Sequence, residues 1–189
     1  MTITAITGGI GSGKSVVSRV VVTMGFPVYD CDTRAKMLMD NDRTILDELR
    51  ERISPDVVDE DGRINRKLLS TIVFSDADKL SVLNEIVHGS VREDLRRWCK
   101  EHRDSERLFV ETAILYQSGL DRMVDEVWEV NAPRQLRVER VMLRNGCEAS
   151  EVERRMDSQY FVPERVHPDV NVIVNDGVKA VLPQINALL

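Results

Sequence analysis

The residues that carry chemistry begin close to the N-terminus, where residues 8–15 read GGIGSGKS directly after the strand-like run TITAIT. This stretch fits the pattern GxxxxGK[ST], in which glycines let successive backbone N–H groups turn inward around a phosphate. The helix expected next adds the positive end of its dipole to the same anion. Lys14 reaches the β- and γ-phosphates, and the Ser15 hydroxyl is placed to ligate Mg²⁺. The pattern therefore predicts a nucleotide site for ATP with Mg²⁺.

The predicted nucleotide-binding residues of this loop are Gly9, Ile10, Gly11, Ser12, Gly13, Lys14, Ser15 and Val16. The alternative is a glycine-rich turn that binds nothing. That alternative is weak here, because a strand leads into the motif and SVVSRVVVTM follows it with helical spacing.

The segment VYDCDTRAKML places Asp30 and Asp32 two residues apart. On a strand, such residues face the same side, which at the carboxyl end of the strand we expect to be the side of the phosphate-binding loop. One carboxylate there accepts the proton of an attacking hydroxyl or holds a Mg²⁺-bound water. We assign the catalytic role to Asp32. The alternative is that Asp32 only caps a helix that begins near Thr33.

Glu111 and His88 are two further candidate site residues, and their roles depend more strongly on the surrounding sequence. Glu111 ends a candidate strand in FVETAILYQSG, where a carboxylate supports a metal ion in the manner of a Walker B acid. An ordinary charge at a strand end is an equal alternative. His88 lies in the helical segment NEIVHGSV, and a single helical histidine is more often structural than catalytic.

An arginine-rich segment, RQLRVERVMLRNG, has Arg137, Arg140 and Arg144 at helical spacing on one face, with Gly146 as the expected helix end. Arginines on a movable helical flap would close over ATP and stabilise charge on the transferred phosphoryl group. The alternative is a solvated face of i, i+4 ion pairs. The shared face favours a functional role for Arg140 and Arg144.

The composition of the chain limits the classes of protein to which it can belong. A chain of 189 residues with 42% apolar residues is long enough for one core with insertions. A net charge of -6 without a long basic run argues against a nucleic-acid partner. Cys31, Cys99 and Cys147 are odd in number and lack metal-binding spacing, which indicates a reducing compartment. Without a bilayer-length apolar run or a leader pattern, we expect a cytoplasmic protein without a membrane partner.

Apolar strand-like runs alternate with helical patterns, which predicts an α/β fold with a parallel five-stranded sheet. The expected strands are Thr2–Thr7, Pro27–Asp30, Leu108–Thr112, Glu126–Asn131 and Val170–Val174. Two helical insertions interrupt the alternation. We expect a core of residues 1–31, 104–133 and 166–189, with insertions at residues 32–103 and 134–165. Insertions at the carboxyl ends of the strands would lie where open α/β sheets bind ligands.

Taken together, these segments resemble the dephospho-CoA kinase family over nearly the whole chain. ITGGIGSGKS is similar to the family's N-terminal signature, and VYDCDTRAKML to its Asp-x-Asp segment. Four later family segments also have counterparts here, in the same order. These counterparts are RINRKLLSTIVF with LNEIVHGSV, then ETAILYQSGL, then NAPRQLRVERVMLRNG with RRMDSQ, and finally VIVNDG. A phosphate-binding loop alone is common to many families, and the ordered set is more specific.

The resemblance implies a three-layer α/β/α P-loop fold similar to nucleoside monophosphate kinases, with residues 32–103 taking the acceptor and 134–165 forming a lid. It implies transfer of the ATP γ-phosphoryl group to the 3′-hydroxyl of 3′-dephospho-CoA, which gives CoA and ADP. The resemblance implies that Asp32 is the general base and that Lys14 and Arg140 stabilise the developing charge. It implies acceptor contacts for Asp32, His88 and Tyr116. It also implies nucleotide contacts for Arg144 and Asn175 and metal contacts for Ser15 and Glu111.

The sequence departs from the family's pattern at six positions. Val16 replaces a Thr, Gly89 replaces a Pro, and Arg137 replaces a Gln of the lid. In the family's Pro-Leu-Leu-Phe-Glu segment, Ala113 and Ile114 replace the first two residues and Gln117 replaces the Glu. Lys14, Ser15, Asp32 and Arg140 are all retained, so we expect an active enzyme. Another small-molecule or nucleotide kinase of the same architecture is the first alternative. A nucleotide-dependent switch is the second, although no guanine-reading Asn-Lys-x-Asp is present. The oligomeric state is left open.

Overall fold

The computed structural model describes residues 1–158 and 161–189, and Gln159 of the RRMDSQ segment lies outside them. The chain divides into two compact units, one of residues 1–30 with 102–189 and one of residues 31–101. In the described residues, no helix combines the length and the apolar composition needed to cross a membrane.

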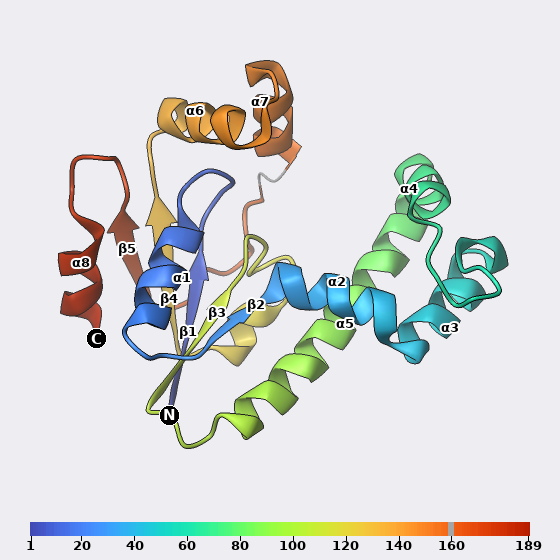
Figure 1. Cartoon of the computed structure of the whole chain (residues 1–189), viewed down its shortest axis with the longest axis horizontal. Helices are drawn as coiled ribbons and strands as arrows, with labels where there is room; N and C mark the ends of the chain where they lie inside the picture. Colours follow the sequence, from blue (N-terminus) through green and yellow to red (C-terminus); the bar gives the residue numbers. More distant parts are fainter. Residues whose placement is uncertain (159–160) are drawn as a thin grey trace. The chain divides into compact units, whose positions relative to one another are not determined.

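The first unit is built on a sheet of five parallel strands in the order β2-β3-β1-β4-β5 (Figure 1). The strands are β1 (Thr2–Thr7), β2 (Val28–Asp30), β3 (Arg107–Glu111), β4 (Glu126–Asn131) and β5 (Val170–Val174). Three of the five have the predicted bounds, β2 begins one residue later than predicted, and β3 begins and ends one residue earlier. The predicted α/β class with a parallel five-stranded sheet is confirmed.

The centre of the sheet is apolar and packs against helices α1 (Lys14–Thr23) and α8 (Val181–Leu188). Phe109 lies between two aromatic rings at edge-to-face geometry, 5.6 Å from Phe26 and 5.0 Å from Trp128 between centroids. The buried cluster here consists of Ile6, Val17, Val21, Phe109, Trp128, Val130, Ile173 and Ile185. This packing fixes β1 at the middle of the sheet, with the phosphate-binding loop at its carboxyl end.

A polar cluster lies on the three central strands, β3, β1 and β4. The buried Thr4 hydroxyl donates to the Glu126 carboxylate at 2.6 Å, and the Arg107 guanidinium pairs with the same carboxylate. Arg107 also lies over the Trp128 ring, 5.9 Å from its centroid. The Thr4 hydroxyl, the Glu126 carboxylate and the Arg107 guanidinium therefore satisfy one another within the sheet.

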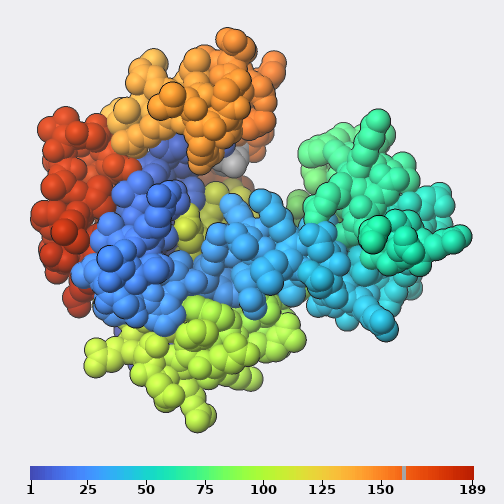
Figure 2. Space-filling model, in the orientation of Figure 1, coloured from blue at the N-terminus to red at the C-terminus, as the bar shows by residue number. Residues whose placement is uncertain are grey.

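Two helices follow β4 and form a hairpin, α6 (Arg134–Asn145) and α7 (Ala149–Ser158). Gly146 ends α6 at φ +64°, which confirms its prediction as the helix end. The hairpin buries its own small cluster of Val138, Val141, Val152 and Met156, and Ile10 of the phosphate-binding loop packs against that cluster. Figure 2 shows the hairpin as a continuous orange body next to the N-terminal segment. A short 3-10 turn, η2 (Leu120–Met123), follows β3.

The second unit contains helices α2 (Cys31–Asn41), α3 (Arg43–Arg52), α4 (Arg66–Ser75) and α5 (Ala77–Glu101), with the 3-10 turn η1 (Pro55–Val57). Its buried cluster includes Ile45, Leu49, Val57 and Leu69, and Leu38 and Met39 of α2 pack against it. Residues 59–62 form a turn, closed by a hydrogen bond from Gly62 N–H to the Asp59 carbonyl at 3.1 Å. The helical character predicted for this region is confirmed.

The structure corrects the geometry predicted for Asp32. β2 ends at Asp30 and α2 begins at Cys31, so Asp30 and Asp32 do not share a strand face. Asp32 lies in the first turn of α2, and it does not cap a helix that starts near Thr33. Both expectations were wrong because the chain passes from strand to helix without an intervening loop, which alternation along the sequence does not reveal.

One buried ion pair joins α2 to α5. Arg34 donates to the Asp94 carboxylate from Nε at 2.8 Å and from Nη2 at 2.7 Å, and Arg97 approaches the other oxygen at 3.4 Å. The Asp94 side chain is 8% exposed and that of Arg34 is 35% exposed. In the same unit, Arg66 and Asp40 are paired at 2.6 Å with both side chains about half exposed.

We predict that Asp94→Ala lowers the free energy of unfolding by about 2–3 kcal/mol, because it removes a buried carboxylate that accepts two hydrogen bonds from the Arg34 cation. The control Asp40→Ala breaks an exposed pair and should cost less than about 1 kcal/mol. Urea unfolding followed by circular dichroism measures both. Equal losses in the two variants would show that burial of the Arg34–Asp94 pair has no energetic consequence.

Candidate active site

The loop between β1 and α1 has a backbone that only glycine accepts readily. Gly8, Gly11 and Gly13 have φ values of +144°, +78° and +96°. At Gly11, a Cβ atom would lie 2.5 Å from the Arg137 carbonyl oxygen, and at Gly8 it would collide with the Val130 carbonyl. The loop therefore has no room for side chains at Gly8 and Gly11, where β4 and α6 approach it, and α1 begins immediately after it at Lys14.

The loop between β1 and α1 has the features of a phosphate-binding site. The Ser12 hydroxyl is buried and, in the described part of the chain, has no hydrogen-bond partner. An unpaired buried hydroxyl is costly unless a ligand or water satisfies it. Together with the start of α1 and its dipole, the loop provides an anion-binding environment. Lys14 Nζ donates to the Gly8 carbonyl at 2.8 Å, which holds its ammonium group against the loop.

Helix α6 lies against the loop through two arginines. Arg137 Nε donates to the Ile10 carbonyl at 2.9 Å. Arg140 donates to the Ser12 carbonyl at 3.5 Å and to Asn175 Oδ1 at 3.4 Å. Asn175 Nδ2 in turn donates to the Ser12 carbonyl at 2.9 Å. The predicted residues Arg140 and Asn175 are thus brought together on one carbonyl of the phosphate-binding loop.

Arg137 is a site residue to which the sequence analysis gave no role. Burial, and then the nearby Arg134 cation, lower the pKa of Arg137, yet its guanidinium stays charged at neutral pH because its ordinary pKa is so high. The signal was available, since Arg137 shares a helix face with Arg140. Arg144, by contrast, is exposed in the last turn of α6 and donates to Asn145 Oδ1 at 3.1 Å. Its predicted nucleotide contact stays a prediction.

Carboxylates meet at the carboxyl edge of the sheet. Asp30 of β2 and Glu111 of β3 are partners in register, and Ile6 of β1 pairs with Glu111 on the other side. Within the described residues, no group of three His, Cys, Asp or Glu side chains is arranged to hold a metal ion. Mg²⁺ in nucleotide sites uses one or two protein oxygens together with phosphates and waters. The Ser15 hydroxyl and the Glu111 carboxylate fit that limited role.

In the second unit, Asp32 and His88 lie on α2 and α5. The Arg34–Asp94 pair fixes the first turns of α2, which include Asp32, against α5. Burial lowers the pKa of the half-buried His88, and the neighbouring Arg92 cation lowers it further. His88 is therefore neutral at pH 7 and is able to accept or donate a hydrogen bond.

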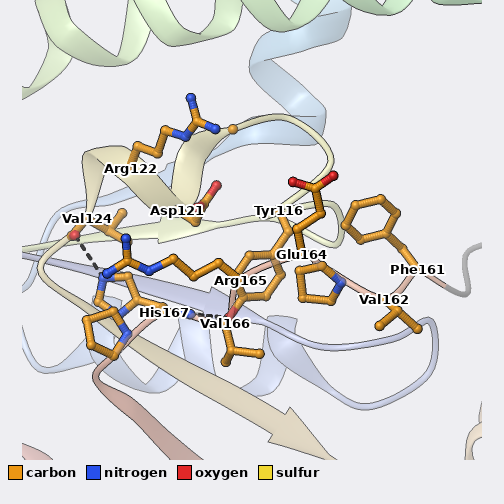
Figure 3. A pocket seen from close by; sticks show the side chains of 13 residues that line it. Tyr116, Asp121, Arg122, Val124, Phe161, Val162, Glu164, Arg165, Val166 and His167 are labelled. Carbon is orange, nitrogen blue, oxygen red and sulfur yellow. Dashed lines mark hydrogen bonds between the residues drawn. The ribbon is translucent and has the colours of Figure 1, made fainter.

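Tyr116 lies where the chain leaves β3, and it lines two cavities of the first unit (Figure 3). The smaller cavity, of about 270 Å³, includes Gly8 and Gly9 in its lining. The larger, of about 820 Å³, includes Tyr116 and residues 161–168. No motif in the sequence pointed to residues 161–168, because their composition resembles that of an ordinary connecting loop.

Comparison with known proteins gives one consistent result. A sequence model of the family described as dephospho-CoA kinase matches residues 2–180. A dephospho-CoA kinase of Porphyromonas gingivalis is 44% identical over 82% of this chain and 75% of its own length. One of Bacteroides fragilis is 38% identical over 97% of this chain and 89% of its own length.

Two solved structures are similar as well. TT1252 from Thermus thermophilus is 33% identical with a TM-score of 0.73, and the match covers 99% of this chain and 94% of that one. The dephospho-CoA kinase of Campylobacter jejuni has a TM-score of 0.68 over 98% of this chain and 94% of that one. At 21% identity, the latter match supports the fold alone.

We predict that Gly8→Ala weakens ATP binding at least about tenfold, or roughly 1.4 kcal/mol, because the new methyl group displaces the loop. Gly25→Ala is the matched control, since Gly25 also has a positive φ, of +95°, but no atom lies within 4 Å of its added Cβ. Titration calorimetry measures both affinities. Equal affinity for ATP in the two variants would contradict the close-approach requirement at Gly8.

Proposed function

The chain belongs to the dephospho-CoA kinase family and is a kinase of coenzyme A synthesis, and from this premise we propose how its residues perform the reaction. The phosphoryl donor is ATP, held by residues 9–16, and the acceptor is 3′-dephospho-CoA. The oxygen of the acceptor 3′-hydroxyl attacks the γ-phosphorus. The bond from that phosphorus to the β–γ bridging oxygen breaks, and ADP leaves.

The proposal depends most on one observation, the shared contact of Arg140 and Asn175 with the Ser12 carbonyl. It supports a cation at the mouth of the loop, where charge develops on the transferred group. Lys14 supplies a second cation from the loop itself. A phosphoryl transfer needs little more from the protein than positioning and neutralisation of this kind.

Asp32 accepts the proton of the 3′-hydroxyl in this scheme. Its position in the first turn of α2, with α2 tied to α5 by Arg34 and Asp94, supports a side chain held in a fixed orientation. The resemblance of VYDCDTRAKML to the family's Asp-x-Asp segment supports the same assignment. His88 and Tyr116 contact the acceptor, and Arg144 contacts the nucleotide when the α6–α7 hairpin closes over it.

Mg²⁺ is the proposed metal ion, held by the Ser15 hydroxyl and supported by Glu111. It neutralises charge on the β- and γ-phosphates when it is bound. Ser15 is exposed in the first turn of α1, where its oxygen is accessible to a metal–nucleotide complex.

We further propose that residues 32–103 take the acceptor and that residues 134–165 act as the lid over a core of residues 1–31, 104–133 and 166–189. The protein works in the cytoplasm and without nucleic-acid or membrane partners. The odd number of cysteines, Cys31, Cys99 and Cys147, supports a reducing compartment.

For the general base, we predict that Asp32→Asn lowers kcat by at least about a hundredfold, because a positioned base contributes on that order. The affinity for ATP should stay within about twofold of wild type, since the change leaves the loop intact. Initial rates at saturating substrates, together with ATP titrations, measure both. A kcat within about threefold of wild type, only roughly 0.7 kcal/mol of barrier, would rule out this role.

For the lid arginine, we predict that Arg140→Ala lowers kcat much more than it raises KM for dephospho-CoA, because its charge acts on the transferred phosphoryl group. Arg134→Ala on the same helix is the control, since Arg134 pairs with the exposed Asp157 at 3.0 Å and, unlike Arg140, donates no hydrogen bond to the loop in the described structure. A rise in KM for the acceptor without a fall in kcat would mean that Arg140 only binds substrate.

A further inference from the structure

The larger of the two cavities has no role in the reaction as described so far. It measures about 820 Å³ and is formed within the first unit by two segments, residues 116–124 after β3 and residues 161–168 before β5. Figure 3 shows the side chains that line it. The volume lies within the range typical of small-molecule sites. We call it the arm cavity.

The walls of the arm cavity are tied together by His167. Its backbone N–H donates to the Tyr116 hydroxyl at 3.4 Å, and its Nε2 lies 3.3 Å from the Val124 carbonyl. Its Nδ1 lies 2.9 Å from the Asp169 carbonyl. One residue of the second segment thus contacts both ends of the first. The cavity therefore has defined sides and is not just a gap between two loops.

The arm cavity adjoins the phosphate-binding loop. The smaller cavity of about 270 Å³ is lined by Thr7, Gly8 and Gly9 at the end of β1 and by Glu129 of β4. Both cavities share four lining residues, Tyr116, Phe161, Pro163 and Val166. A ligand whose reacting hydroxyl sits beside the loop therefore has a continuous path past Tyr116 and Phe161 into the larger space.

The chemistry of the arm cavity is both apolar and cationic. Phe161, Val162 and Val166 are 47%, 68% and 59% exposed, so three large apolar side chains face solvent within six residues. Isolated exposed apolar residues need no explanation, but a cluster at a cavity indicates a ligand surface. The cluster suits a flexible ligand arm with methyl and methylene groups.

The cationic part consists of Arg122 and Arg165, neither of which forms an ion pair within the described residues. Asp121 and Glu164 also line the cavity. Figure 3 shows the Glu164 carboxylate well apart from the Arg165 guanidinium, which extends toward Val124 and His167. Arg165 therefore presents a fork of donors that matches a phosphate group.

We propose that the arm cavity binds the pantetheine diphosphate portion of the acceptor, with the arm on Phe161, Val162 and Val166 and a phosphate on Arg165. This inference rests on the proposed function, because it takes dephospho-CoA as the acceptor. It assigns part of acceptor recognition to the first unit, through residues 161–168 at the end of the proposed lid and the start of the following core segment, in addition to the helical residues 32–103.

The test compares steady-state kinetics of Arg165→Ala, Phe161→Ala and Arg165→Lys in the full chain. Arg165→Ala should raise KM for dephospho-CoA at least about tenfold, because it removes a charge-assisted hydrogen bond. KM for ATP should change less than about twofold. Arg165→Lys keeps the charge and should recover part of the loss. Lys179→Ala, which removes an exposed cation that lies outside the proposed lid and has no ion pair in the described chain, is the charge-matched control.

A second readout uses 4′-phosphopantetheine, which has the arm and one phosphate but no nucleoside. It should inhibit the wild type competitively against dephospho-CoA and not against ATP, and Phe161→Ala should weaken this inhibition. Unchanged KM for dephospho-CoA in both alanine variants, or no competition by 4′-phosphopantetheine, overturns the assignment of the cavity alone. A wild-type chain that does not phosphorylate dephospho-CoA overturns the proposed function together with it.

Discussion

The structure depends on a loop in which three glycines are required by the backbone conformation and by the close approach of neighbouring atoms. Between β1 and α1 the chain reverses in a loop whose Gly8, Gly11 and Gly13 have positive φ values and leave no room for a Cβ atom. Because β1 is the central strand, this loop opens at the middle of the carboxyl edge of the sheet. Open α/β sheets bind ligands at that edge, where the chain connections diverge to the two sides.

The same loop explains how the α6–α7 hairpin is held. Ile10 packs into the hairpin's apolar cluster, and the Ile10 and Ser12 carbonyls accept hydrogen bonds from Arg137 and Arg140. At Gly11 the missing side chain leaves room for the Arg137 carbonyl, so the loop and α6 approach each other closely. Movement of α6 and the conformation of the loop are therefore coupled through direct contacts.

Much of this could be predicted from the sequence. The strands were predictable because buried parallel strands are short, β-branched runs, and Thr2–Thr7, Glu126–Asn131 and Val170–Val174 have the predicted bounds. The phosphate-binding loop was predictable because its chemistry imposes fixed residue types at fixed spacing. Gly146 was recognisable as a helix end for the same local reason.

Other features depend on contacts that spacing does not encode. Asp32 was expected on a strand, but α2 begins directly after β2, and the boundary between two adjoining elements has no compositional mark. Arg137 was passed over because only the docked helix shows which arginines of a common face contact backbone carbonyls. The arm cavity arises from residues 116–124 and 161–168, which meet only in the folded chain.

The measurement that tests the central claim most directly is ADP release by the purified chain with ATP and Mg²⁺, compared across 3′-dephospho-CoA, AMP, adenosine and no acceptor. The account predicts strong release only with 3′-dephospho-CoA, with CoA identified as the product by mass spectrometry. Release with AMP or adenosine in its place would retain the phosphate-binding chemistry and contradict the acceptor. Equal release without any acceptor would contradict phosphoryl transfer to an alcohol altogether.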